Sequence, residues 1–182
     1  MSGIPEVGDL APDFTLRDQH GAELTLAQVR ARSAVVLVFY PFAFSGLCTG
    51  ELREIRDGLE DFQDDGIQVL AISCDPMYAL RSWADQEGYF FPLLSDFWPH
   101  GEVARRYGVF LEDKGFATRG TFLLDREGER GVLVAEGLRQ PDLVVEQQPV
   151  LVPAGEHVQA EAHLPEEGLR LLQLAQLRRR EE

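Results

Sequence analysis

The most apolar short run of the chain is Val35-Val36-Leu37-Val38-Phe39-Tyr40, and it leads directly into Pro41-Phe42-Ala43-Phe44-Ser45-Gly46-Leu47-Cys48-Thr49-Gly50-Glu51. An unbroken apolar run of this length is typical of a strand buried on both faces. After the proline and glycine, one face of a predicted helix carries apolar residues at steps of four and three: Cys48, Leu52, Ile55, Leu59 and Phe62. The stretch therefore predicts a central strand, a tight turn and a helix that begins close to Cys48.

Cys48 is expected in the first turn of that helix, on its inward face and just beyond the end of the strand. Unpaired N–H groups and the positive end of the helix dipole stabilise a thiolate at such a position. This placement favours a nucleophilic thiolate over the alternative, a buried structural cysteine. Thr49, Gly50 and Glu51 follow Cys48, so the second sulfur of a Cys-x-x-Cys dithiol is absent.

The other elements are expected to alternate along the chain. Asp18-Gln19-His20-Gly21 has the composition of a turn and predicts an N-terminal β-hairpin, followed by a short helical turn near Ala27. The core is then predicted in chain order: strand 34–40, helix 47–62, strand 68–73, helix 77–86, strand 90–94, helix 102–107, and a hairpin of 121–124 with 132–134. This order indicates an α/β fold with a central mixed sheet and helices on both faces. Cys48 and Cys74 both fall at the carboxyl ends of parallel strands, where chemistry gathers in such sheets.

A single domain is expected over residues 1–182, since this length is sufficient for one hydrophobic core. Residues 140–163 are weakly patterned, and we expect an added arm or hairpin there. A C-terminal helix is predicted over 165–180, because a proline and two glutamates open the segment and three arginines close it.

Charge and composition limit the possible partners. The formal net charge of −14 argues against nucleic acid and against anionic membrane surfaces. No apolar run approaches the ~20 residues of a membrane span, and the first residues lack the pattern of a secretory signal. Two cysteines in differently patterned segments do not make a disulfide framework. A cytoplasmic location with reduced thiols is therefore expected.

Neither a metal nor an organic cofactor is expected. The four histidines have no ligand spacing with one another or with the cysteines. His100 could act as a base for Cys48, but a structural contact at a helix start is the alternative. No phosphate-binding glycine loop follows any strand, which argues against nucleotide and flavin cofactors.

Two motifs resemble those of the peroxiredoxins. Pro41-x-x-x-Ser45-x-x-Cys48 resembles their active-site signature, Pro-x-x-x-Thr/Ser-x-x-Cys, and Arg119-Gly120-Thr121-Phe122 resembles their second, arginine-containing motif. The segments 42–52, 93–101 and 107–110 are similar to the one-cysteine alkyl hydroperoxide reductase E type. The resemblance extends from about residue 7 to about residue 135 and implies a thioredoxin-like fold.

The resemblance implies a thiol-dependent peroxidase for hydrogen peroxide and organic hydroperoxides. Cys48 would attack the peroxide and become sulfenic acid, while Arg119 would donate to the thiolate and to the peroxide oxygens. Ser45 would hydrogen-bond the peroxide, and Pro41 would shield the sulfur. Glu51 is expected to orient Arg119; the alternative is a carboxylate that only complements the helix dipole.

The reduction of the oxidised sulfur is left open by the sequence. Cys74 either resolves the Cys48 sulfenic acid as an internal disulfide or is a core cysteine. In the one-cysteine case an external thiol is required, and the resemblance implies a reductant of the mycothiol/mycoredoxin-like or thioredoxin-like kind. It also implies a homodimer or higher homo-oligomer that forms through the surface around 41–45 and Trp83. A redox-sensing protein and a thiol-disulfide oxidoreductase of the same fold are the alternative functions.

Overall fold

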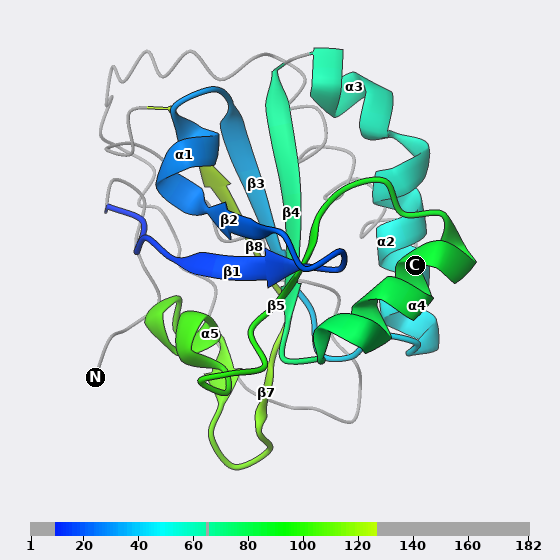
Figure 1. Ribbon diagram of the computed structural model, residues 1–182, viewed down its shortest axis with the longest axis vertical. Helices are drawn as coiled ribbons and strands as arrows, with labels where there is room; N and C mark the ends of the chain where they lie inside the picture. The colour runs from blue at the N-terminus through cyan, green and yellow to red at the C-terminus, as the bar shows by residue number, and fades with distance from the viewer. Residues whose placement is uncertain (1–9, 65, 127–182) are drawn as a thin grey trace, which may run out of the picture. The chain divides into compact units, whose positions relative to one another are not determined.

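The computed structural model of the protein describes residues 10–64 and 66–126. Its strands, in chain order, are β1 (Thr15–Asp18), β2 (Glu23–Thr25), β3 (Ala34–Phe39), β4 (Ile67–Ser73), β5 (Leu93–Ser95), β6 (Phe110–Leu111), β7 (Phe116–Ala117) and β8 (Gly120–Leu124). Its helices are α1 (Leu26–Arg30), α2 (Gly46–Asp57), α3 (Leu59–Asp64), α4 (Met77–Glu87) and α5 (Glu102–Arg106). Figure 1 shows how these elements are arranged.

Six strands form one mixed sheet in the order β2-β1-β5-β4-β3-β8. The three central strands β3, β4 and β5 are parallel, whereas β8 pairs antiparallel with β3 and β1 pairs antiparallel with β5. The antiparallel β1–β2 hairpin and the short helix α1 are found where the sequence predicts them. The expected thioredoxin-like α/β fold is confirmed.

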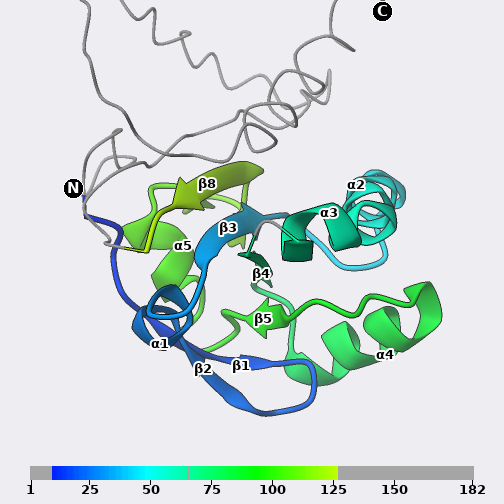
Figure 2. The same ribbon diagram turned by 90° about the horizontal axis from the view of Figure 1, so that it is seen from above.

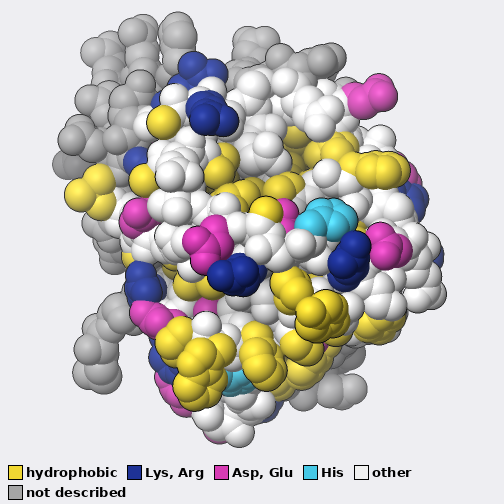
Figure 3. Space-filling view, viewed as in Figure 1, with side chains coloured by type: hydrophobic (Ala, Val, Ile, Leu, Met, Phe, Trp, Pro, Cys, Tyr) yellow, Lys and Arg dark blue, Asp and Glu magenta, His cyan; other side chains and the backbone are white. Residues whose placement is uncertain are grey.

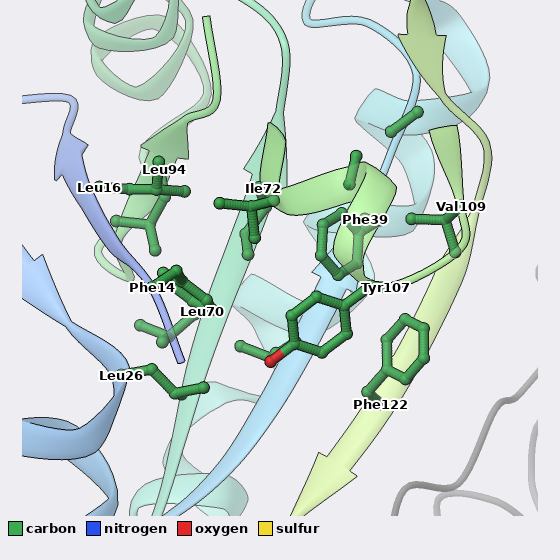
Figure 4. Close-up of a cluster of buried hydrophobic side chains, with 14 of the residues drawn as sticks. Phe14, Leu16, Leu26, Phe39, Leu70, Ile72, Leu94, Tyr107, Val109 and Phe122 are labelled. Carbon is green, nitrogen blue, oxygen red and sulfur yellow. The ribbon is translucent and has the colours of Figure 1, made fainter. Parts of the chain in front are cut away.

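Helices cover both faces of this sheet (Figure 2). Helices α2, α3 and α4 lie on one face, and α4 buries Leu80, Trp83 and Ala84 against the sheet. Helices α1 and α5 lie on the other face, over the apolar cluster shown in Figure 4. That cluster includes Phe14, Leu26, Phe39, Leu70, Ile72, Tyr107 and Phe122. Burial of such side chains contributes about 1.5–3 kcal/mol each, so the apolar runs of β3 and β4 fix the centre of the sheet.

Two predicted boundaries are wrong, and one pair of strands was not predicted. The single helix expected over 47–62 is two helices, because Gly58 ends α2 and glycine is a poor helix former. The strand expected over 90–94 begins only at Leu93, and Phe90 is 85% exposed. The antiparallel pair β6–β7 was not predicted, since strands of two residues carry no periodic pattern.

The remaining predictions lie outside the described residues: the hairpin strand 132–134, the added arm 140–163 and the C-terminal helix 165–180. Within the part of the chain that the structure describes, no helix is long and apolar enough to span a membrane.

Candidate active site

Cys48 lies in the first turn of α2 and its residue surface is fully buried. Ser45 is the N-cap of this helix, and its Oγ accepts a hydrogen bond from the Cys48 N–H at 3.3 Å. The Ser45 carbonyl in turn accepts from the Thr49 hydroxyl at 2.8 Å. The predicted strand–turn–helix geometry is therefore present, and the sulfur lies where the backbone N–H groups and the helix dipole favour a negative charge.

Arg119 reaches this sulfur from a distant part of the chain. It immediately precedes β8, whose antiparallel pairing with β3 places Gly120 opposite Phe39. This register brings Arg119 to the edge of the sheet at which the chain leaves β3 for α2. The Nη2 atom of Arg119 donates to the Cys48 Sγ at 3.3 Å.

Glu51 forms an ion pair with Arg119. Its two carboxylate oxygens accept from the Arg119 Nε at 2.9 and 3.0 Å, and the side chains are only 23% and 12% exposed respectively. Burial raises the pKa of Glu51 above its ordinary value, and the hydrogen bond and charge of Arg119 offset part of that rise. One guanidinium thus contacts both the Glu51 carboxylate and the Cys48 thiol.

The loop between β3 and α2 is held by Asp75, a residue that sequence reasoning missed. Pro41 is buried, and the Ala43 N–H donates to the Asp75 Oδ2 at 2.8 Å. Phe44 then adopts a φ of 62°, which is unusual for a residue with a large side chain. Asp75 follows the carboxyl end of β4, and that position in a parallel sheet was the one available signal for it.

Tyr89 contacts the first turn of α2, which also carries Cys48. Its hydroxyl donates to the Thr49 carbonyl at 3.2 Å, and its ring packs edge-on against Trp83 at a centroid distance of 5.1 Å. Burial raises the pKa of Tyr89 to about 12, so the phenol remains a donor at neutral pH. The segment that follows α4 therefore supports the turn that carries Cys48.

Cys74 immediately follows β4 and is also a free, buried cysteine. Burial, with a further contribution from the charge of Asp96, raises the pKa of its thiol to about 12. A thiol with this pKa is almost entirely protonated at neutral pH and is therefore a weak nucleophile.

Both ring nitrogens of His100 face backbone carbonyls, at 3.3 Å from Phe97 O and 2.6 Å from Gly115 O. This is the structural contact that was expected as the alternative to a base. Among the residues that the structure describes, no cluster of three or more His, Cys, Asp or Glu side chains could hold a metal ion.

A lone thiol in contact with a guanidinium is suited to two-electron reduction of a peroxide, because the arginine can stabilise charge on both sulfur and oxygen. On a thioredoxin-like sheet, this arrangement is that of the thiol-dependent peroxidases. The chain belongs to the AhpC/TSA family, whose sequence pattern matches residues 7–129, and within it to the alkyl hydroperoxide reductase E type of peroxiredoxin.

The relatives support this assignment. The chain is 49% identical over 142 residues to the alkyl hydroperoxide reductase E of Mycobacterium tuberculosis and to that of Mycobacterium bovis, which covers 78% of this chain and 91% of each relative. The solved structure of peroxidoxin BcpB from M. tuberculosis aligns with a TM-score of 0.63 at 34% identity, over 70% of this chain and 82% of that one. The reduced 2-Cys peroxiredoxin of Plasmodium vivax aligns with a TM-score of 0.62 at 26% identity, over 71% and 72%. The protein is accordingly a thiol-dependent peroxidase whose reaction passes through a cysteine sulfenic acid.

Proposed function

We propose that Cys48 is the peroxidatic cysteine of this enzyme and that Arg119 acts directly on the reacting atoms. The observation that carries the proposal is the 3.3 Å contact between Arg119 Nη2 and Cys48 Sγ at the start of α2. The helix start and the guanidinium both favour the thiolate, which is the nucleophilic form of cysteine.

The reaction proposed for Cys48 is a two-electron transfer. The thiolate attacks one oxygen of a hydroperoxide, an S–O bond forms and the O–O bond breaks. The sulfur is oxidised to sulfenic acid, the peroxide is reduced, and the leaving oxygen departs as water or an alcohol after it takes up a proton.

The neighbouring side chains divide the remaining roles. Because the Arg119 Nε is bound to Glu51 and its Nη2 to the sulfur, we assign the Nη1 atom to the peroxide oxygens. Ser45 Oγ, which lies at the helix start, would donate to the peroxide while it accepts from the Cys48 N–H. Pro41 shields the sulfur, and Glu51 orients Arg119.

An external thiol would return the sulfur to its reduced state. It condenses with the sulfenic acid to a mixed disulfide and water, and a second thiol then releases Cys48 and carries away the disulfide. A mycothiol/mycoredoxin-like or thioredoxin-like reductant fits this scheme. The raised pKa and burial of Cys74 favour a core cysteine over a resolving one.

An aromatic surface supports self-association into a homodimer. Large side chains that are at least 46% exposed follow β3 or lie near α4 and α5: Phe42, Phe44, Tyr78, Phe97 and Trp98. Figure 3 shows hydrophobic side chains gathered over the lower part of the molecule, around α5 and β7. Exposed apolar groups of this number favour a protein partner. The net charge of −14 disfavours nucleic acid or an anionic membrane, and reduced thiols fit the cytoplasm.

Mass spectrometry after one equivalent of peroxide tests the cysteine assignment. Wild-type protein and Cys74→Ser should both gain a single oxygen that a sulfenic acid probe traps at Cys48. Cys48→Ser should neither consume peroxide nor gain the oxygen. An intramolecular Cys48–Cys74 disulfide would instead make Cys74 the resolving residue. Fast peroxide reduction by Cys48→Ser would reject the assignment, and slow oxidation without turnover under several thiol reductants would favour a redox sensor.

A further inference from the structure

Asp75 links the end of β4 to the loop that precedes the reactive cysteine. Its Oδ2 accepts two hydrogen bonds, from the Ala43 N–H at 2.8 Å and from the Ser73 Oγ at 2.9 Å. Ala43 lies in the loop between β3 and α2, 32 residues away from Asp75 along the chain. The carboxylate therefore joins the segment that follows β4 to the loop that follows β3.

Asp75 is itself held in place by residues of the central sheet. The Ser95 hydroxyl donates to the Asp75 carbonyl at 2.7 Å, and the Asp75 N–H donates to the Ser73 Oγ at 3.3 Å. Ser73 and Ser95 are paired residues of the parallel strands β4 and β5. The position of the carboxylate is consequently set by the central sheet, whereas Ala43 belongs to a connecting loop.

The backbone of the loop between β3 and α2 is strained next to this contact. Phe44, directly after Ala43, has a φ of 62°, in the left-handed region that residues with a Cβ adopt only at a free-energy cost. Phe44 is 51% exposed, and its ring packs against Trp83 at a centroid distance of 6.1 Å, so the ring is only partly buried. The next residue, Ser45, must reach the extended conformation of an N-cap for α2 to begin correctly.

We propose that Asp75 is a positioning residue for the reaction at Cys48: by holding the Ala43 N–H it fixes the conformation at Phe44 and thereby the placement of Ser45 and Cys48 against Arg119. This proposal rests on the proposed role of Cys48. The charge of Asp75 does not itself promote the reaction, because a negative charge near the sulfur disfavours the thiolate. Asp75 contributes through the position that its hydrogen bond gives to Ala43. Consistent with their proximity, burial raises the pKa of the Tyr40 hydroxyl, and the charges of both Asp75 and Cys48 raise it further.

Three substitutions separate this role from a general structural one. Asp75→Ala removes the acceptor, whereas Asp75→Asn keeps a carbonyl oxygen of the same reach. Asp85→Ala removes an exposed carboxylate from α4 and is the matched control. The readouts are the single-turnover rate of Cys48 oxidation by hydrogen peroxide, amide hydrogen exchange in the peptide that contains Ala43, and the melting temperature.

Asp75→Ala should slow Cys48 oxidation roughly tenfold or more, as expected for a lost hydrogen bond to a charged acceptor. It should also speed exchange at Ala43, while Asp75→Asn restores most of both properties and Asp85→Ala changes neither. If Asp75→Ala does not fold, Asp75→Ser serves in its place, because its hydroxyl is too short to reach Ala43.

An Asp75→Ala protein with wild-type oxidation rate and unchanged exchange at Ala43 would overturn the proposal, as would an Asn variant as slow as the Ala variant. The exchange readout does not depend on activity. Wild-type protein that fails to react with peroxide would reject the proposed role of Cys48 and this inference with it, whereas normal wild-type oxidation with an unaffected Asp75→Ala variant rejects only the inference.

Discussion

Arg119 Nη2 lies 3.3 Å from Cys48 Sγ, although 71 residues separate the two along the chain. The antiparallel register of β8 against β3 creates this contact, because it sets Gly120 opposite Phe39 and so brings Arg119 to the start of the loop between β3 and α2. Glu51, one turn further along α2 from Cys48, then binds the Arg119 Nε with both oxygens. The guanidinium is thus fixed before any substrate arrives, which is the condition for electrostatic stabilisation without reorganisation.

Replacement of Arg119 should therefore affect the chemical step far more than the fold. We expect Arg119→Ala to slow Cys48 oxidation roughly 100-fold or more, as for the loss of a preorganised donor. The oxidation rate of Arg119→Lys should lie between those of wild type and Arg119→Ala, because lysine keeps the charge but cannot contact Glu51 and the sulfur together. Stopped-flow measurement of peroxide reduction, with a thermal melt of each variant, tests this. Near-normal rates for Arg119→Ala would remove the arginine from the reaction.

The Glu51–Arg119 pair predicts a specific pH dependence. Burial raises the pKa of Glu51, so this carboxylate takes up a proton at a higher pH than an ordinary glutamate and then loses its attraction for Arg119. Glu51→Gln should be slower than wild type at neutral pH, by roughly tenfold. The ratio of the two oxidation rates should shrink as the pH falls, since protonated Glu51 resembles glutamine.

The effect of every group that titrates in both proteins, Cys48 included, cancels when the wild-type oxidation rate is divided by that of Glu51→Gln. The pH dependence of this ratio therefore reports on Glu51. The matched control is Glu60→Gln, which changes an exposed carboxylate on α3 and should follow wild type at every pH. A wild-type to Glu51→Gln ratio that is constant from neutral to acidic pH would show that the charge of Glu51 does not orient Arg119.

The same raised pKa also has a consequence for folding. Because folded Glu51 binds its proton more tightly than the unfolded chain does, its contribution to stability is present at low pH and is lost as the pH rises through the folded-state pKa. At neutral pH the ionised Glu51 that binds Arg119 therefore lowers the stability of the fold, although its charge attracts the guanidinium.

The sequence was sufficient to predict the elements that bear Cys48, Ser45 and Glu51, because an apolar run, a break and a helical period occur together there. Arg119 was predicted by resemblance alone, since no local pattern indicates that β8 lies beside β3. The Asp75–Ala43 contact could not be predicted, because it joins a side chain to a backbone N–H across two loops. The break at Gly58 and the pair β6–β7 were missed for a related reason: each is shorter than the window over which periodicity is measured.

Cys74 should make the protein less stable in alkali. In the unfolded chain the thiol loses its proton near the ordinary cysteine pKa of 9.0, whereas burial raises the pKa of the folded thiol to about 12. Between these values the unfolded state binds fewer protons, so stability falls as the pH rises, and the full contribution is present only below pH 9. We expect roughly 1 kcal/mol more loss between pH 8 and pH 10 for wild type than for Cys74→Ser.

Urea unfolding of both proteins at each pH measures this difference directly. Tyrosines whose pKa is raised by burial, such as Tyr89, are present in both proteins, so their contributions cancel in the comparison. Stability curves that run parallel from pH 8 to pH 10 would mean that the Cys74 thiol ionises as readily in the folded protein as in the unfolded chain. Such a thiol would again be a candidate resolving residue.

Two glycines with the same backbone conformation provide the last prediction. Gly101 precedes α5 with a φ of 67°, and a Cβ placed there would lie 2.1 and 2.3 Å from ring atoms of Phe110. Gly88 ends α4 with a φ of 69°, and a Cβ there would meet no atom within 4 Å. Alanine at either site costs about 1–2 kcal/mol for the left-handed conformation. Only Gly101→Ala also forces Phe110 to move.

Phe110 has little freedom to give way, since the Arg105 guanidinium lies 3.9 Å from its ring centre and His100 packs edge-on against it. We therefore expect Gly101→Ala to lose about 1–3 kcal/mol more free energy of unfolding than Gly88→Ala, which is the usual cost of overpacking. Urea denaturation of the two variants isolates the steric contribution, because the backbone cost is common to both. Equal losses would show that the β6–β7 hairpin moves freely against α5, and that Phe110 does not fix its position.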